Sequence, residues 1–233
     1  MTVELSGRDL AIVQLVTRFK QATTAHVYEL LFTTASRSPC DIALHRLTKQ
    51  HYLHRIERRA VGGRRGGSGQ YVYALGRRGF FMSSVGNYRP ARTVDYHALQ
   101  IVETYLALQR LHVAGQLTIA GYSTEPDCWQ TVGGMALKPD MYVELENPAG
   151  GRMGLWLEID MGTEGQRQIR DKFMRYWRAY EAAEDWPVFR VVFIAIDQER
   201  AKELNWLLEQ GSDEQRELFR VVTLPEFTAL LTS

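Results

Sequence analysis

The chain has 233 residues, 45% of them hydrophobic and 24% charged, which is enough for one large or two small globular domains. No apolar run approaches the ~20 residues of a membrane span, and the N-terminus does not resemble a signal peptide, so we expect a cytoplasmic protein with no membrane partner. Two cysteines, Cys40 and Cys128, argue against a disulfide-stapled secreted fold and exclude a cysteine-type zinc site.

The net charge of +1 conceals two parts of opposite sign. Residues 1–92 carry 15 Lys+Arg and 5 Asp+Glu, a net charge of +10, whereas residues 93–233 have a net charge of −9. This asymmetry predicts a first domain at 1–85, a linker at 86–95 and a second domain at 96–233. A small domain with a strong positive charge favours a polyanionic partner, most often nucleic acid.

Three short helical patterns open the first domain. Apolar residues recur at helical spacing within 10–20, Thr23 or Thr24 can cap a second helix, and Ser38-Pro39 suggests an N-cap and first-turn proline for a third. The outer face of this third helix is polar and mostly basic, as entry into a DNA major groove requires. Its candidate DNA contacts are Arg37, Ser38, His45, Arg46, Lys49 and Gln50.

A hairpin pattern follows the three helices. Residues 54–61 and 71–75 are typical of strands, and 62–69 form a glycine-rich turn. Three helices followed by a hairpin with a basic tip predict a winged helix-turn-helix. Its wing would contact DNA through Arg58, Arg59, Arg64 and Arg65, although a surface loop without a partner is the alternative.

The second domain shows an α/β pattern. A helix at 95–112 is followed by candidate strands at 117–122, 137–145 and 153–161, a helix at 164–183, a buried strand at 188–196, a helix at 198–210, a short strand at 219–222 and a helix from Pro225. The fold class is therefore α/β (α+β), with a mixed sheet in the second domain.

Acidic residues stand at particular places in these strands. Asp140 follows Lys138-Pro139 at the start of the second strand, and Glu158 and Asp160 point to the same face of the third. If the two strands pair, the three carboxylates gather and repel one another, which Mg²⁺ or Mn²⁺ would relieve. Without such a metal we expect no cofactor.

Lys172 completes a candidate catalytic set with Asp140 and Glu158, because it lies on the following helix and is long enough to reach back. Asp140 could instead shape a turn, and the other acids could be solvated or paired with Arg167 or Arg170. On the same helix, Phe173, Trp177 and Tyr180 have the spacing of a buried face. Lys172 and Tyr176 share another face, directed either toward the acids or toward solvent.

Residues 24–32, 44–47 and 71–79 resemble the winged-helix part of the replication-relaxation proteins of plasmids and integrative elements. The second domain resembles the restriction-endonuclease-like core with its Pro-Asp…Glu-x-Lys signature, and Asp140 and Glu158 match the family acids. Together the resemblances cover roughly residues 8 to 200. Asp160 stands where active nucleases usually have lysine, although some similar members carry this lysine on the next helix, where Lys172 stands.

The resemblance implies a DNA-binding accessory protein of a plasmid or mobile element that acts in DNA replication, relaxation or conjugative transfer. The implied partners are double-stranded DNA, relaxase or replication proteins, and a second copy of the chain. A non-catalytic nuclease-like domain is favoured over an active one. The alternatives are a metal-dependent endonuclease targeted by the winged helix and a transcriptional repressor with an oligomerising second domain.

Overall fold

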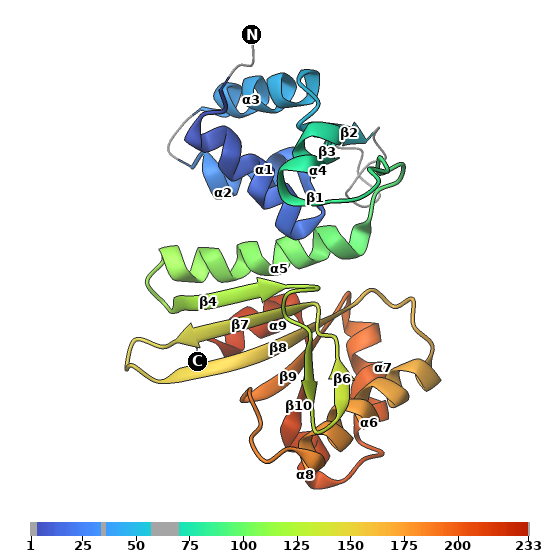
Figure 1. The fold of residues 1–233 in the computed structure, drawn as a ribbon. Helices are drawn as coiled ribbons and strands as arrows, with labels where there is room; N and C mark the ends of the chain where they lie inside the picture. The colour runs from blue at the N-terminus through green and yellow to red at the C-terminus, as the bar shows by residue number, and fades with distance from the viewer. Residues whose placement is uncertain (1–3, 34–35, 57–69, 233) are drawn as a thin grey trace. The chain divides into compact units, whose positions relative to one another are not determined.

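The computed structural model describes residues 4–33, 36–56 and 70–232, and the chain divides into two compact units, Met1–Leu106 and Ala107–Ser233 (Figure 1). Each unit has its own buried core. Within the described residues, every helix is too short or too polar to cross a membrane.

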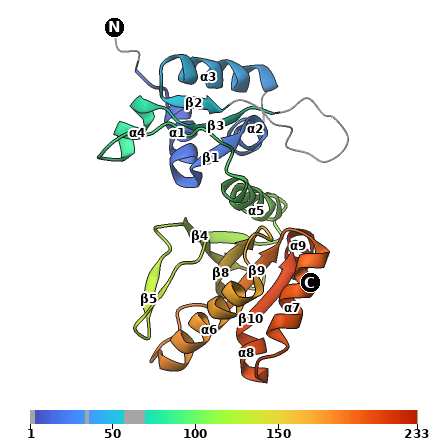
Figure 2. The same cartoon turned by 90° about the vertical axis from the view of Figure 1, so that its right-hand side faces the viewer.

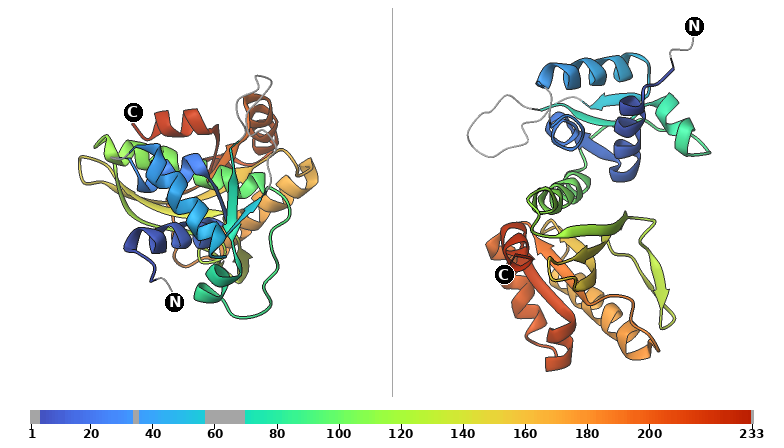
Figure 3. Two further views of the ribbon diagram at one scale, coloured as in Figure 1. Left: turned by 90° about the horizontal axis from the view of Figure 1, so that it is seen from above. Right: turned by 90° about the vertical axis from the view of Figure 1, so that its left-hand side faces the viewer.

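The first unit contains the predicted succession of three helices and a hairpin (Figure 3). In chain order its elements are α1 (Gly7–Phe19), β1 (Gln21–Thr23), α2 (Thr24–Leu31), α3 (Arg37–Lys49), β2 (Leu53–Ile56), β3 (Val72–Leu75), α4 (Arg77–Ser83) and the first turns of α5 (Tyr96–Val113). The short strands form an antiparallel sheet in the order β1-β3-β2. The tip between β2 and β3, with the predicted wing residues Arg58, Arg59, Arg64 and Arg65, lies outside the described residues.

The starts of α2 and α3 differ in how well sequence predicts them. Thr23 caps α2 through a hydrogen bond from the His26 amide to its hydroxyl, as expected. The predicted start of α3 was wrong, because its N-cap is Ser36 rather than Ser38. Pro39 therefore lies at the third helical position, which it tolerates because the backbone amides of the first turn have no partner within the helix.

The second unit has a mixed sheet, as predicted (Figure 2). Its elements after α5 are β4 (Thr118–Thr124), β5 (Gln130–Val132), β6 (Met135–Leu137), β7 (Met141–Glu146), β8 (Arg152–Asp160), α6 (Gln166–Ala182), β9 (Arg190–Ala195), α7 (Gln198–Leu208), α8 (Asp213–Leu218), β10 (Phe219–Thr223) and α9 (Leu224–Leu230). The sheet order is β10-β9-β8-β7-β4, antiparallel from β4 to β8 and parallel from β8 to β10.

Helices α6 and α7 cover one face of this sheet (Figure 1). The buried stripe of α6 is Ile169, Phe173, Tyr176 and Ala179. The expected stripe was therefore partly wrong: Phe173 belongs to it, but Trp177 is only half-buried and Tyr180 is exposed. The stripe follows the residues that meet Trp156 and Phe193 of the sheet, so Tyr176 points inward rather than to solvent.

Candidate functional site

Strand pairing brings Asp140 beside Glu158. Strands β7 and β8 are antiparallel, with Met141 opposite Leu157, so Asp140 lies just before the paired region. Its amide donates to the Leu157 carbonyl at 3.0 Å, and its Oδ2 accepts from the Ile159 amide at 2.6 Å. Both acids are buried. Burial raises the pKa of Glu158 to about 7, and the charge of Asp140 adds to this effect.

Two side chains of α6 converge on Glu158. Lys172 Nζ lies 3.1 Å from Glu158 Oε2, and the Tyr176 hydroxyl donates to Oε1 at 2.5 Å. The two are one helical turn apart, so they share a face, and that face is turned toward the acids. Lys172 also lies 3.0 Å from Glu164. Burial opposes its charge, but the carboxylates of Glu158 and Glu164 outweigh burial and raise the pKa of Lys172.

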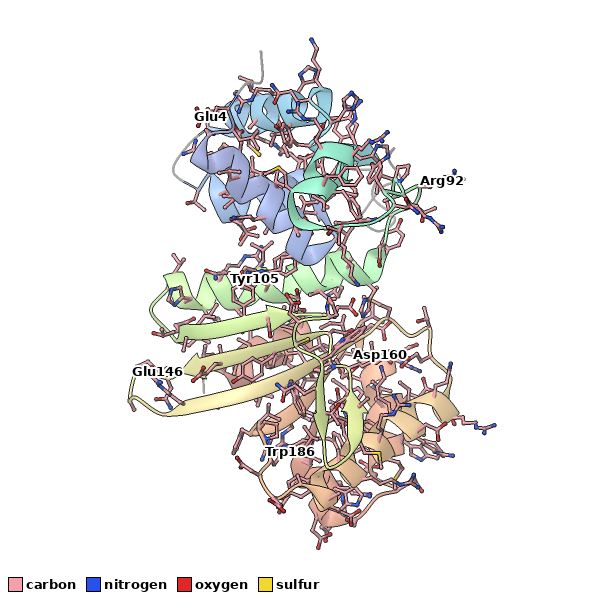
Figure 4. The ribbon with its side chains drawn as sticks, in the orientation of Figure 1. Glu4, Arg92, Tyr105, Glu146, Asp160 and Trp186 are labelled. Carbon is pink, nitrogen blue, oxygen red and sulfur yellow. The ribbon has the colours of Figure 1, made fainter. Side chains whose placement is uncertain are left out.

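Asp160 does not join this network. Labelled in Figure 4 at the end of β8, it receives two hydrogen bonds from the guanidinium of Arg200, at 2.7 and 3.0 Å. The Gly162 amide donates to the same carboxylate at 2.8 Å. Arg200 is itself buried and its pKa is raised, first by the hydrogen bond to Asp160. The structure therefore gives Asp160 a fixed cation of its own, supplied by neither Arg167 nor Arg170.

Sequence reasoning missed Glu125, which adds a further carboxylate near Asp140. An oxygen of Glu125 lies within 4.8 Å of one of Asp140, and the Glu125 amide donates to the Asp140 carbonyl at 3.0 Å. Glu125 follows the end of β4 and precedes Pro126, so strand alternation gave no signal for it. Glu125, Asp140 and Glu158 are hard oxygen donors whose chemistry fits Mg²⁺ or Mn²⁺. A cation at Glu158 would compete with Lys172 for the same carboxylate.

The buried thiol beside these acids is an unsuitable ligand. Cys128 Sγ donates to the Pro139 carbonyl at 3.0 Å. Burial raises the pKa of Cys128 to about 12, so the thiol stays protonated at neutral pH, whereas metal binding requires the thiolate.

A second candidate surface lies on the first unit, where α3, β2 and β3 surround a hollow of about 600 Å³. Along α3, Arg37, Asp41, His45 and Lys49 line it at intervals of four residues, and all four are exposed. Arg55 of β2 also lines the hollow, with its guanidinium carbon 4.4 Å from the ring centre of Tyr71. Asp41 is the one acidic residue among the described residues that line the hollow, against the three cations Arg37, Lys49 and Arg55.

The other predicted contacts of α3 are placed differently. Arg46 donates to the buried carboxylate of Asp9 at 2.5 Å, which ties α3 to α1. Burial works in the opposite direction, but hydrogen bonds from Ser6 and Arg46 hold the pKa of Asp9 below its usual value. Ser38 is exposed in the first turn, and Gln50 ends the helix with its Oε1 atom buried.

Comparison with known proteins places the chain in a family. No curated protein and no solved structure matches it. A family model described as replication-relaxation matches residues 13–192, from α1 into β9. The match includes the hollow beside α3 and the network of Asp140, Glu158 and Lys172, but it ends before Arg200. Because it covers well over half of the chain, this protein belongs to the replication-relaxation family.

Proposed function

We propose that this protein is a DNA-binding accessory protein of a plasmid or mobile element that acts in replication, relaxation or conjugative transfer. Family membership supports a role in plasmid or mobile-element replication or relaxation. The observation that carries DNA binding is the basic hollow of the first unit, where Arg37, His45, Lys49 and Arg55 surround a concave surface. The excess of positive charge in residues 1–92 agrees with a polyanionic partner.

In this proposal the first unit is a winged helix-turn-helix, and α3 is its recognition helix. Residues at i, i+4, i+8 and i+12 of a helix form one continuous stripe, so Arg37, Asp41, His45 and Lys49 present a single row of side chains. Helix α3 has the length of a major-groove reader, and the basic residues at its two ends can hold phosphates. His45 lies between them, where base edges would be read.

Equilibrium binding to duplex DNA tests the role of this surface. Replacing Arg37 and Lys49 by alanine removes two exposed cations, and we expect affinity at low salt to fall by at least about tenfold. Lys202→Ala, an exposed lysine of the second unit, is the matched control and should bind as the native protein does. Unchanged affinity in the double variant would show that the hollow does not bind DNA.

We further propose that the second unit is a non-catalytic, nuclease-like scaffold. Two observations support this assignment. Lys172 and Tyr176 donate hydrogen bonds to the two carboxylate oxygens of Glu158, and the Arg200 guanidinium donates to both carboxylate oxygens of Asp160. Carboxylates that would bind a metal ion in an active nuclease therefore already accept hydrogen bonds from side chains of the same unit.

A metal-dependent endonuclease is the second candidate, and one observation favours it. Lys172 reaches Glu158 from the helix after β8, the place where a displaced nuclease lysine would act. Nicking of supercoiled plasmid in Mg²⁺ or Mn²⁺ separates the two candidates. The scaffold proposal expects no metal-dependent nicking. Nicking that is present in the native protein and lost in Asp140→Asn, Glu158→Gln and Lys172→Met would establish the enzyme instead.

A further inference from the structure

A groove of about 690 Å³ lies in the second unit, on the sheet face opposite α6 and α7. Leu155 of β8, Val192 of β9 and Phe227 of α9 line it, and all three side chains are buried. Two other lining side chains, Phe189 and Leu230, are 62% and 53% exposed. Phe189 and Leu230 therefore give the groove apolar surface that a ligand can reach, above a floor of buried side chains, and its volume is typical of small-molecule sites.

Two arginines, Arg190 and Arg220, line the groove beside these apolar side chains. In the parallel register of the sheet, Arg190 lies opposite Leu155 and Arg220 opposite Val192, so both arginines share the face of the groove. Burial and the charge of Arg220 lower the pKa of Arg190, whereas Glu217 works in the opposite direction. Two like charges on neighbouring strands and on one face of the sheet repel each other, and a bound anion would relieve this repulsion.

We propose that this groove binds a small amphipathic anion, whose carboxylate or phosphate pairs with Arg190 and Arg220 while its apolar body lies against the exposed Phe189 and Leu230. Guanidinium groups match such anions because their parallel N–H donors fit two oxygens at once. The site is separate from the acid–lysine network, because Glu158 points to the α6 face of the sheet.

The surroundings of the groove favour a small ligand over larger anions. Residues 93–233 carry a net charge of −9, which repels an acidic peptide or a nucleic acid more strongly than it repels a single anionic group. The charged sugar–phosphate backbone of duplex DNA also offers no large apolar group that could pack against the apolar lining of the groove. A ligand with one anionic end and one apolar end satisfies both parts of the groove.

Titration calorimetry of the full chain with decanoate and with decyl phosphate tests this proposal, and decanol and decyltrimethylammonium serve as probes of matched length. We expect at least one of the two anions to bind and to bind at least about tenfold more tightly than the neutral or cationic probe. Binding of decanoate alone or of decyl phosphate alone would identify the anionic group. Equal binding of decanol, or no binding of either anion, would overturn the proposal.

Variants localise the site. Arg190→Gln combined with Arg220→Gln should weaken anion binding by about tenfold or more, and Leu230→Ala should weaken it through the apolar end. Arg152→Gln, which removes an exposed arginine paired with Glu146, is the control and should leave binding unchanged. Native affinity in the folded double variant would overturn the proposal. The double variant should keep its affinity for duplex DNA, so this result is independent of the proposed function.

Discussion

The charged residues of the two candidate sites differ in burial and in pairing. In the second unit, Glu158 and Asp160 are buried and each is matched by cationic or hydroxyl donors of the same chain. In the first unit, Arg37, Lys49 and Arg55 are exposed along one hollow. Buried, internally paired charges are coupled to the folding of a unit, whereas exposed like charges leave their attraction available to a partner. Substitutions should therefore affect stability in one region and binding in the other.

The largest effect is expected at the buried ion pair of the second unit. Arg200→Ala leaves the Asp160 carboxylate buried without its cation, which should lower the free energy of unfolding by about 3–5 kcal/mol. Urea denaturation monitored by tryptophan fluorescence measures this change, because all five tryptophans lie beyond residue 92. Combining Arg200→Ala with Asp160→Asn removes the unpaired charge and should recover much of the loss. Native stability in the single variant would show that the pair has no structural role.

A smaller effect, dependent on pH, is expected at Glu158. Its folded pKa of about 7 lies above the ordinary value of 4.5, so the protonated carboxyl is favoured by folding. The stabilisation is therefore fully present below pH ~4.5 and is lost as pH rises through about 7. Glu158→Gln should remove this loss, so that its urea midpoint exceeds the native one at pH 8 but not at pH 4.5. If the variant is less stable at pH 8, the charged pair with Lys172 outweighs the cost of burial.

The same variant tests metal binding. A cation between Asp140 and Glu158 would bind the deprotonated carboxylates and stabilise the native protein, most strongly above pH 7. In the scaffold proposal, Mg²⁺ and Mn²⁺ leave the melting temperature of the native protein unchanged, because Lys172 and Tyr176 already donate to both oxygens of Glu158. A rise that Glu158→Gln abolishes would support the endonuclease instead.

The smallest effect is expected on α3, where a cation paired within the chain, Arg46, can be compared with an exposed lysine of the hollow, Lys49. Arg46 is 44% exposed and paired with Asp9, so Arg46→Ala should lower the free energy of unfolding by up to about 1 kcal/mol. It should change DNA affinity less than Lys49→Ala does, because the Arg46 guanidinium is engaged by α1. Thermal unfolding and DNA titration of the two variants give this comparison. A larger loss of affinity in Arg46→Ala would return Arg46 to the DNA contacts inferred from the sequence.

Sequence patterns predicted what depends on local spacing. Pairing of the second and third strands of the second domain predicted that Asp140 and Glu158 meet, and the length of the Lys172 side chain predicted that it could reach them. Arg200 was missed because its contact with Asp160 spans 40 residues and depends on the packing of α7. Glu125 was missed for the same reason, since only tertiary structure brings a loop after β4 to Asp140.

Short elements were also missed. Strands β1, β5 and β6 and helices α4 and α8 have between three and seven residues each, too few to show a periodic pattern. The buried face of α6 was predicted incompletely because Trp177 and Tyr180 have the right spacing for a buried stripe. Tyr176 is buried instead, because its hydroxyl reaches Glu158. The spacing of apolar residues alone does not predict that a helix will bury the face whose side chains hydrogen-bond to a buried carboxylate.

The central claim is that exposed cations beside α3 hold duplex DNA, and the salt dependence of binding tests it most directly. Each phosphate contact adds roughly 0.9 to the slope of log affinity against log salt concentration. The account predicts that Arg37→Ala combined with Lys49→Ala flattens this slope by about 2, whereas Lys202→Ala leaves it at the native value. Equal slopes in the native protein and the double variant, over the same salt range, would contradict the account.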